Sequence, residues 1–158
     1  MYPLREGEID SIRAIYKNTY AIYVKKESGV TWDGKTFSNL ARPIGTQLSY
    51  AIAEDLRNMG YKVIEEDSVT NNLDKLVAGR ISVYADIETI VDNTLRKHKL
   101  KYAAVKKIPQ ALKEKVYYLL ISKGFAAKHP QLTERIWAAV RDVQKTDSYQ
   151  EMLKKYEN

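Results

Sequence analysis

Short apolar segments rich in β-branched and aromatic residues alternate with segments of helical period along most of the chain. The first kind predicts strands at residues 20–24, 41–44, 61–64, 81–85 and 116–121. The second kind has apolar residues every three or four positions and predicts helices at 47–59, 73–77 and 87–95. Strands and helices that alternate at this spacing favour βαβ units, and therefore an α/β fold with a mostly parallel sheet flanked by helices.

The last third of the chain has a different pattern, because two helical periods follow the strand at 116–121 with no strand between them. The first of these helices gathers its apolar residues on one face: Leu132, Ile136, Ala139, Val140 and Val143. The longest apolar run, at 116–121, is far shorter than the roughly 20 residues that cross a bilayer. We therefore expect a globular α/β domain with a helical C-terminal tail and no transmembrane segment.

The formal net charge of +6 is compatible with a nucleic-acid partner, which would need basic residues concentrated in one stripe. The 26 basic residues are instead scattered among 20 acidic ones. Their densest cluster, residues 96–101, falls at the end of a predicted helix, where cations complement the helix dipole. We interpret it as a solvated helix end rather than a binding patch, and predict no nucleic-acid partner. The absence of cysteine excludes disulfide and thiolate chemistry.

Ligands of open α/β sheets bind at the carboxyl ends of the strands, where loops lead into helices. The first junction of this kind is predicted at Gly45-Thr46-Gln47, between the strand at 41–44 and the next helix. Gly45 would let a ligand approach the backbone, Thr46 offers a hydroxyl, and the N–H groups from Gln47 onwards would face an anion. The alternative interpretation is that Thr46 is an ordinary helix N-cap.

The second junction is predicted at Asp86, which directly follows the apolar strand at 81–85 and opens the next helix. Its carboxylate could accept hydrogen bonds from a ligand ammonium group, each worth roughly 1.5–3 kcal/mol. Here too the alternative is an N-cap. An anion site and a cation site on one edge of one sheet match the two charges of an α-amino acid.

Catalytic and metal sites have less support in the sequence. The only histidines, His98 and His129, have polar neighbours near predicted helix ends, where surface histidines are common. The consecutive carboxylates at 65–67 would point in different directions from a strand end, so we interpret them as a solvated loop. No phosphate loop, zinc-ligand pair or nucleophile elbow is present. We predict that the chain is not an enzyme and has no cofactor and no metal.

The order of these features resembles the second half of the bacterial extracellular solute-binding family 3, the periplasmic proteins of polar amino-acid transport. The similar features, in chain order, are the strand at 20–26, the Gly45-Thr46 junction, the Leu…Leu…Gly-Arg helix end at 72–80, the strand ending in Asp86, the returning strand at 116–123 with its Ser-Lys, and the tail from 130 to 156. The resemblance covers nearly the whole chain. It departs near Thr19, where the family has a Phe-Ser…Pro-Tyr segment after an arginine.

The resemblance implies roles for the site residues and a division of the chain. It implies that Thr46 helps to hold the ligand carboxylate, that Gln47 contributes backbone contacts beside Gly45, and that Asp86 holds the amino group. It divides the chain into a remnant of lobe one, lobe two with both crossover strands, and a helical tail that would pack on lobe one, at residues 1–17, 18–122 and 123–158. Lobe one itself, roughly 100 residues at ordinary domain size, should precede Met1.

The resemblance also implies a function. The full-length precursor would carry a signal peptide, which residues 1–8 do not resemble. The mature periplasmic protein would capture a small polar solute, such as an amino acid, for the permease of an ABC importer by closing its two lobes. One alternative is the input domain of a membrane-bound sensor. The other is a family-related dehydratase, but the sequence lacks the acid/base pair that such an enzyme needs. Without lobe one, the apolar face of the tail helices would be exposed. The tail could fold back on its own lobe, but we favour a homodimer in which two tails bury each other.

Overall fold

A computed structural model describes residues 1–5 and 8–157 and divides the chain into two units. Unit 1 combines Met1–Asn18 with Lys115–Asn158, and unit 2 is Thr19–Glu114. Of the predicted ranges 1–17 and 123–158, residues 6, 7 and 158 lie outside the described residues.

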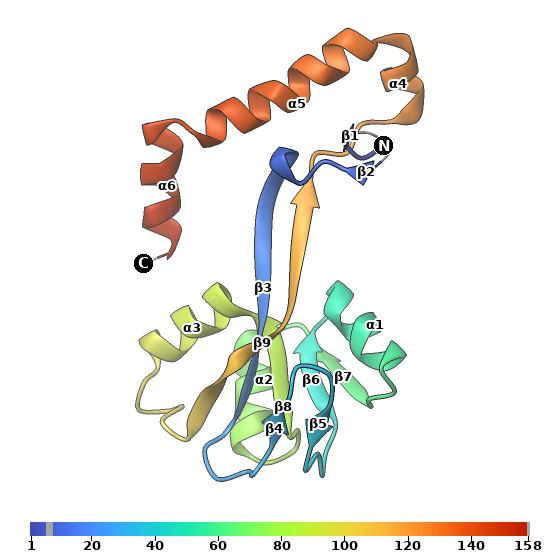
Figure 1. Cartoon of the computed structure of the whole chain (residues 1–158). Coiled ribbons are helices and arrows are strands. Elements are labelled where there is room, and N and C mark those ends of the chain that lie inside the picture. Colours follow the sequence, from blue (N-terminus) through green and yellow to red (C-terminus); the bar gives the residue numbers. More distant parts are fainter. Residues whose placement is uncertain (6–7, 158) are drawn as a thin grey trace. The chain divides into compact units, whose positions relative to one another are not determined.

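Unit 2 is built on a five-stranded sheet with the strand order β7-β6-β8-β3-β9 (Figure 1). The strands are β3 (Ala14–Lys25), β6 (Ile44–Gln47), β7 (Val63–Glu66), β8 (Val83–Ile87) and β9 (Val105–Tyr118). β6 is parallel to both β7 and β8, whereas β3 is antiparallel to β8. The predicted α/β fold with a mostly parallel sheet and flanking helices is confirmed.

Two hydrophobic clusters cover the two faces of this sheet, because successive side chains of a strand point to opposite faces. Ile52 and Leu56 of α1 (Ala51–Asn58) pack with Ile22 and Ile44 in the first cluster. The second cluster joins α2 (Val69–Val77) and α3 (Glu88–Lys97) to the alternate strand residues through Leu73, Leu76, Val91, Ala21, Tyr23 and Tyr84. α1 therefore covers one face, and α2 with α3 covers the other.

The predicted boundaries around β6 are wrong by about three residues. The strand expected at 41–44 runs from Ile44 to Gln47, and the helix expected from Gln47 begins at Ala51. The physical reason is the backbone of Ser49, whose positive φ of 63° turns the chain between strand and helix. An L-residue other than glycine rarely adopts this conformation, so a periodicity pattern does not place it. Ser68 is the N-cap of α2, and its hydroxyl accepts from the backbone N–H of Asn71.

The edge strand β9 is longer than the predicted strand at 116–121. Residues 105–115 of this strand carry several lysines and a proline, and most of them are exposed or half-buried. An edge strand has one side free of partners, so it tolerates lysine and proline and needs no apolar alternation. Two short strands, β4 (Thr31–Trp32) and β5 (Phe37–Ser38), form a hairpin around Gly34.

Unit 1 contains the hairpin of β1 (Leu4–Arg5) and β2 (Glu8–Ile9), the short 3-10 helix Ser11–Arg13, and the helices α4 (Lys123–Lys128), α5 (Pro130–Gln144) and α6 (Asp147–Glu157). Its small core centres on Trp137, which is buried and donates from Nε1 to the carbonyl of Leu119 at 2.9 Å. None of the helices in the described part of the chain combines the length and apolarity that a bilayer span requires.

The apolar face predicted on α5 lines a groove of about 370 Å³ within unit 1. Its walls include Ile15, Ile136, Val140 and Val143. The side chain of Val143 is 54% exposed. The amide of Gln144 donates to the carbonyl of Ile15 at 2.6 Å and fixes one end of the groove.

Candidate functional site

The carboxyl ends of β6, β7 and β8 meet at one edge of unit 2, as expected for parallel neighbours. Gly45 and Thr46 do not form the strand-to-helix junction at this edge. Both lie inside β6, where they align with Tyr84 and Ala85 of β8. The prediction that Gly45-Thr46 leads directly into a helix is therefore wrong.

Gly45 has a packing role in this position. A Cβ atom on Gly45 would lie 2.5 Å from Cδ1 of Ile81 and 2.8 Å from Oδ1 of Asn72, which is closer than side chains normally approach. The amide of Asn72 in turn donates to the carbonyl of Thr46 at 3.1 Å. The missing side chain thus lets α2 and the loop before β8 lie directly against β6. No ligand is needed to explain this glycine.

Thr46 is fully buried and lies on the face of the sheet that α1 covers, since it is two residues after Ile44. Its hydroxyl has no hydrogen-bond partner among the described residues. An N-cap would accept from the first turn of the helix, and the N-cap position of α1 belongs to Tyr50. The N-cap interpretation of Thr46 is therefore wrong, and its role as a ligand contact stays a prediction.

The junction itself consists of Leu48, Ser49 and Tyr50, and it already holds a carboxylate. The backbone N–H of Ser49 donates to Oε2 of Glu65 at 2.9 Å, and Arg57 pairs with the other oxygen of that carboxylate. The hydrogen bond from Arg57, and next the one from Ser49, lower the pKa of Glu65. The N-cap residue Tyr50 makes no side-chain cap bond to the first turn of α1. This junction therefore has the donors of an anion site.

Gln47, the third residue of the predicted junction, joins the ends of β6 and β7. Its side-chain amide donates to the carbonyl of Asp67 at 2.8 Å. The neighbouring backbone N–H of Leu48 donates to the carbonyl of Glu66 at 2.8 Å. Gln47 thus fixes the loops at this edge, and it is half-buried rather than freely presented.

Asp86 lies near the end of β8, and its carboxylate is satisfied from within the chain. One oxygen accepts a hydrogen bond from the hydroxyl of Tyr84, and the other accepts from the backbone N–H of Ile87 at 2.7 Å. The side chain is 0% exposed. Ile87 is the N-cap residue of α3, so both the expectation that Asp86 opens the helix and its N-cap interpretation are wrong.

Burial makes Asp86 an unusual carboxyl group. Loss of solvent raises its pKa, and the hydrogen bonds from Tyr84 and Ile87 only partly oppose this effect. In the described part of the chain no lysine or arginine pairs with it. A buried carboxylate without a cation is costly, and it is suited to receive an ammonium group.

A second polar cluster lies beside Asp86 on the same face of the sheet. The hydroxyl of Tyr23 donates to Oδ1 of Asp92 at 2.7 Å. Lys107 pairs with Asp92 and with Glu88, each at 2.6 Å. Burial and the hydrogen bond to Asp92 raise the pKa of the Tyr23 hydroxyl, which therefore remains a donor. Sequence reasoning missed this cluster, because its members come from β3, α3 and β9.

The geometry does not bring Asp86 and the Thr46 hydroxyl to the same face of the sheet. The side chains of Asp86 and Thr46 point to opposite faces of the sheet, because Thr46 aligns with Ala85. Burial, and next the charge of Asp86, raise the pKa of Tyr84. Tyr50 packs with the cluster on the α1 side of the sheet, whereas Tyr84 belongs to the cluster on the other side. Ser49 and Tyr50 are candidate residues that the sequence pattern did not single out.

No group of three or more histidine, aspartate and glutamate side chains that could hold a metal ion occurs in residues 1–5 and 8–157. Glu65 and Glu66 pair with Arg57 and Lys75, and Glu88 and Asp92 both pair with Lys107. Asp86 is buried with Tyr84, and Asp67 accepts from the amide of Asn71.

Comparisons with known proteins identify the fold. No family model matches the sequence, and no curated protein does either. Among solved structures, a histidine kinase sensor domain with similarity to periplasmic binding proteins matches at a TM-score of 0.68 and 15% identity, covering 89% of this chain and 59% of that one. The GluR0 ligand-binding core from Nostoc punctiforme in complex with L-glutamate matches at 0.66 and 15%, covering 90% and 62%. An ancestral arginine-binding protein bound to glutamine matches at 0.63 and 20%, covering 90% and 61%.

These similarities establish the class of fold. The chain has the α/β architecture of a lobe of periplasmic-binding-protein-like proteins. It spans about three-fifths of the length of the three solved chains. At identities of 15% to 20% the likeness concerns the fold, and the function of this chain is a separate question.

Proposed function

We propose that the chain is part of a solute-binding protein and that unit 2 binds a small polar solute, such as an amino acid, at the carboxyl edge of its sheet. The observation that carries this proposal is Asp86, a buried carboxylate without a cation, one strand away from a junction that already holds a carboxylate. Within the described residues, unit 2 thus offers Asp86 for an ammonium group and the Ser49 junction for a carboxylate.

Each end of the solute would replace an internal partner. The amino group would donate to Asp86 in place of the Tyr84 hydroxyl, and the carboxylate would take the position of Glu65 at the N–H of Ser49. Charge-assisted bonds of this kind contribute roughly 1.5–3 kcal/mol each. Because Asp86 is 0% exposed, the solute reaches it only after the edge opens. Such exchange gives the site two states, one internally satisfied and one bound to solute.

In this proposal the protein is periplasmic and delivers its solute to the permease of an ABC importer. Closure of unit 2 against a second lobe would supply the remaining contacts and signal the loaded state. The solved chains that match are longer than this one, which is consistent with a further lobe in the functional protein.

A second candidate, the input domain of a membrane-bound sensor, is favoured by the match to a histidine kinase sensor domain. Co-purification with a permease or with a kinase would separate the two.

A titration followed by NMR tests solute binding directly. We expect arginine, glutamine or glutamate added to the ¹⁵N-labelled chain to shift the amides of residues 47–51 and 86–88. The affinity should be in the millimolar range, because one lobe supplies only part of the hydrogen bonds and burial. Shifts confined to other residues, or no shifts with any common amino acid at tens of millimolar, would contradict the proposed site.

We also propose that two chains associate through the groove of unit 1. The groove of one chain has apolar walls. A second copy could insert exposed apolar side chains of its own α5, Leu132 and Val143, into this groove. Light scattering at micromolar concentration should give about twice the 18.2 kDa of one chain. Val140→Glu places a charge in the groove and should yield the monomer. A monodisperse monomer of the unaltered chain would contradict the dimer.

A further inference from the structure

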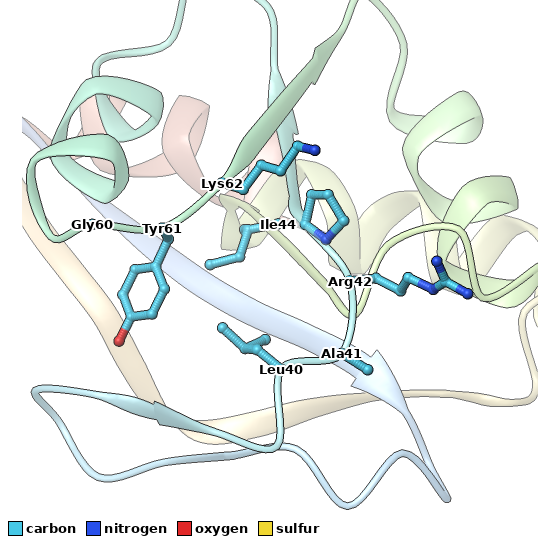
Figure 2. A pocket seen from close by; sticks show the side chains of 8 residues that line it. Leu40, Ala41, Arg42, Ile44, Gly60, Tyr61 and Lys62 are labelled. Carbon is cyan, nitrogen blue, oxygen red and sulfur yellow. The ribbon is translucent and has the colours of Figure 1, made fainter.

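A second concave surface of unit 2 lies at the amino ends of β6 and β7, at the sheet edge opposite to Asp86. It is a cleft of about 400 Å³ formed by residues 40–44 and 60–62 (Figure 2). Hydrogen bonds fix its walls: the N–H of Ile44 donates to the carbonyl of Lys62 at 2.9 Å, and the N–H of Arg42 donates to Oγ of Ser82 at 2.8 Å. The cleft is therefore anchored to the sheet, as preformed ligand sites are.

The cleft has an apolar part and a basic part. Figure 2 shows the side chains of Leu40, Ile44 and Tyr61 close together. The charged ends of Arg42 and Lys62 lie apart from these three side chains, toward the right of the view. The hydroxyl of Tyr61 accepts from the N–H of a neighbouring strand residue, Phe37, at 2.9 Å, so its ring is held in place. A fixed aromatic ring beside aliphatic side chains is a suitable surface for a flat apolar group.

The basic residues at this edge lack internal counter-ions. Arg42, Lys62 and Arg80 precede the neighbouring strands β6, β7 and β8, and none of the three side chains pairs with an acid within the described residues. Lys62 and Arg80 follow α1 and α2, where a cation complements the helix dipole. Arg42 follows no helix, so the dipole does not explain it.

We propose that this cleft is a second binding site, for a small organic anion that joins a flat apolar body to a carboxylate or phosphate group. The body would pack on Leu40, Ile44 and Tyr61, and the anionic group would bind Arg42 and Lys62. A volume of about 400 Å³ falls in the range of small-molecule sites. The proposal does not depend on the solute site at Asp86, which lies at the other end of the strands.

The probes are phenylacetate, phenyl phosphate and the neutral analogue phenylacetamide, each titrated into the ¹⁵N-labelled full chain. We expect the two anions to shift the amides of Ile44, Gly60, Tyr61 and Lys62. Phenylacetamide should bind at least about tenfold more weakly than phenylacetate, because it lacks the charge. The ratio of the affinities for phenyl phosphate and phenylacetate shows which anionic group the site prefers.

Charge-removing variants complete the test. The double variant Arg42→Gln/Lys62→Gln should weaken phenylacetate binding about tenfold or more, whereas Lys99→Gln, a change of an exposed lysine outside the cleft, should leave it unchanged. Both positions are exposed, so the variant spectra should otherwise match the parent. Equal binding of phenylacetamide, shifts at Ser49 and Ile87 in place of the cleft, or no binding of either anion would overturn the proposal.

Discussion

Asp86→Asn should stabilise the fold at neutral pH and remove amino-acid binding. The amide keeps the size of the carboxyl group, can accept from the N–H of Ile87, and can donate to the hydroxyl oxygen of Tyr84. It removes a buried charge that no cation compensates, so the free energy of unfolding should rise by about 1–2 kcal/mol. The lost charge should weaken binding of an amino acid about 10- to 150-fold, the equivalent of one charge-assisted bond.

The stability gain should depend on pH in a defined direction. Burial raises the pKa of Asp86, so the folded chain binds a proton that the unfolded chain has already released. The contribution of Asp86 to stability therefore falls as the pH rises from about the ordinary value of 3.8 to the raised pKa, and is constant above it. The difference in the free energy of unfolding between Asp86→Asn and the parent should accordingly be small below pH 3.8. It should reach its full value above the raised pKa of Asp86. Urea unfolding across this pH range measures it.

A matched control lies in α3, the helix that follows β8. Asp92 pairs with Lys107 and accepts from Tyr23, so Asp92→Asn should lower the free energy of unfolding by about 0.5–1.5 kcal/mol. It should leave amino-acid binding unchanged. Undiminished binding by Asp86→Asn, measured by the same NMR titration, would show that the solute is held elsewhere.

The fold could be predicted from the sequence because its core strands are buried on both faces. The segment at 20–24 is a continuous apolar run, and the predicted strand before Asp86 is apolar except for Ser82. The helices between them have a clear period. The edge strand β9 could be predicted only at its apolar end. Its lysine-rich part is largely exposed, so burial does not require the alternation of apolar and polar residues by which a strand is recognised.

The site was predicted less well, because its positions depend on tertiary contacts. A glycine before a helical period suggests a ligand-binding turn, yet Gly45 serves the packing of Asn72 and Ile81, which follow much later in the sequence. The turn is made by Ser49 in a left-handed conformation, and serine gives little indication of it. The strand-end position of Asp86 could be inferred, but its complete burial under neighbouring groups could not.

Gly45→Ala should destabilise unit 2 by about 1–3 kcal/mol, the usual cost of an added group in a filled core. The backbone of Gly45 is not in the left-handed region, so the cost comes from contacts alone. The new methyl group would lie 2.5 Å from Cδ1 of Ile81 and 2.8 Å from Oδ1 of Asn72. Ile81 can turn aside, but Asn72 can do so only by giving up its hydrogen bond to the carbonyl of Thr46. Thermal and urea unfolding measure the loss.

A double-mutant cycle separates this packing role from a ligand-binding role. Ile81→Val removes the Cδ1 atom that the new methyl group meets first, so Gly45→Ala should cost less in that background than in the parent. Gly124→Ala is a control in α4, where a Cβ meets nothing within 4 Å, and it should be neutral or stabilising by up to about 1 kcal/mol. If Gly45→Ala instead left stability unchanged and abolished amino-acid binding, close approach of a ligand would explain the glycine. We expect the reverse, a less stable chain that retains its affinity for the solute once folded.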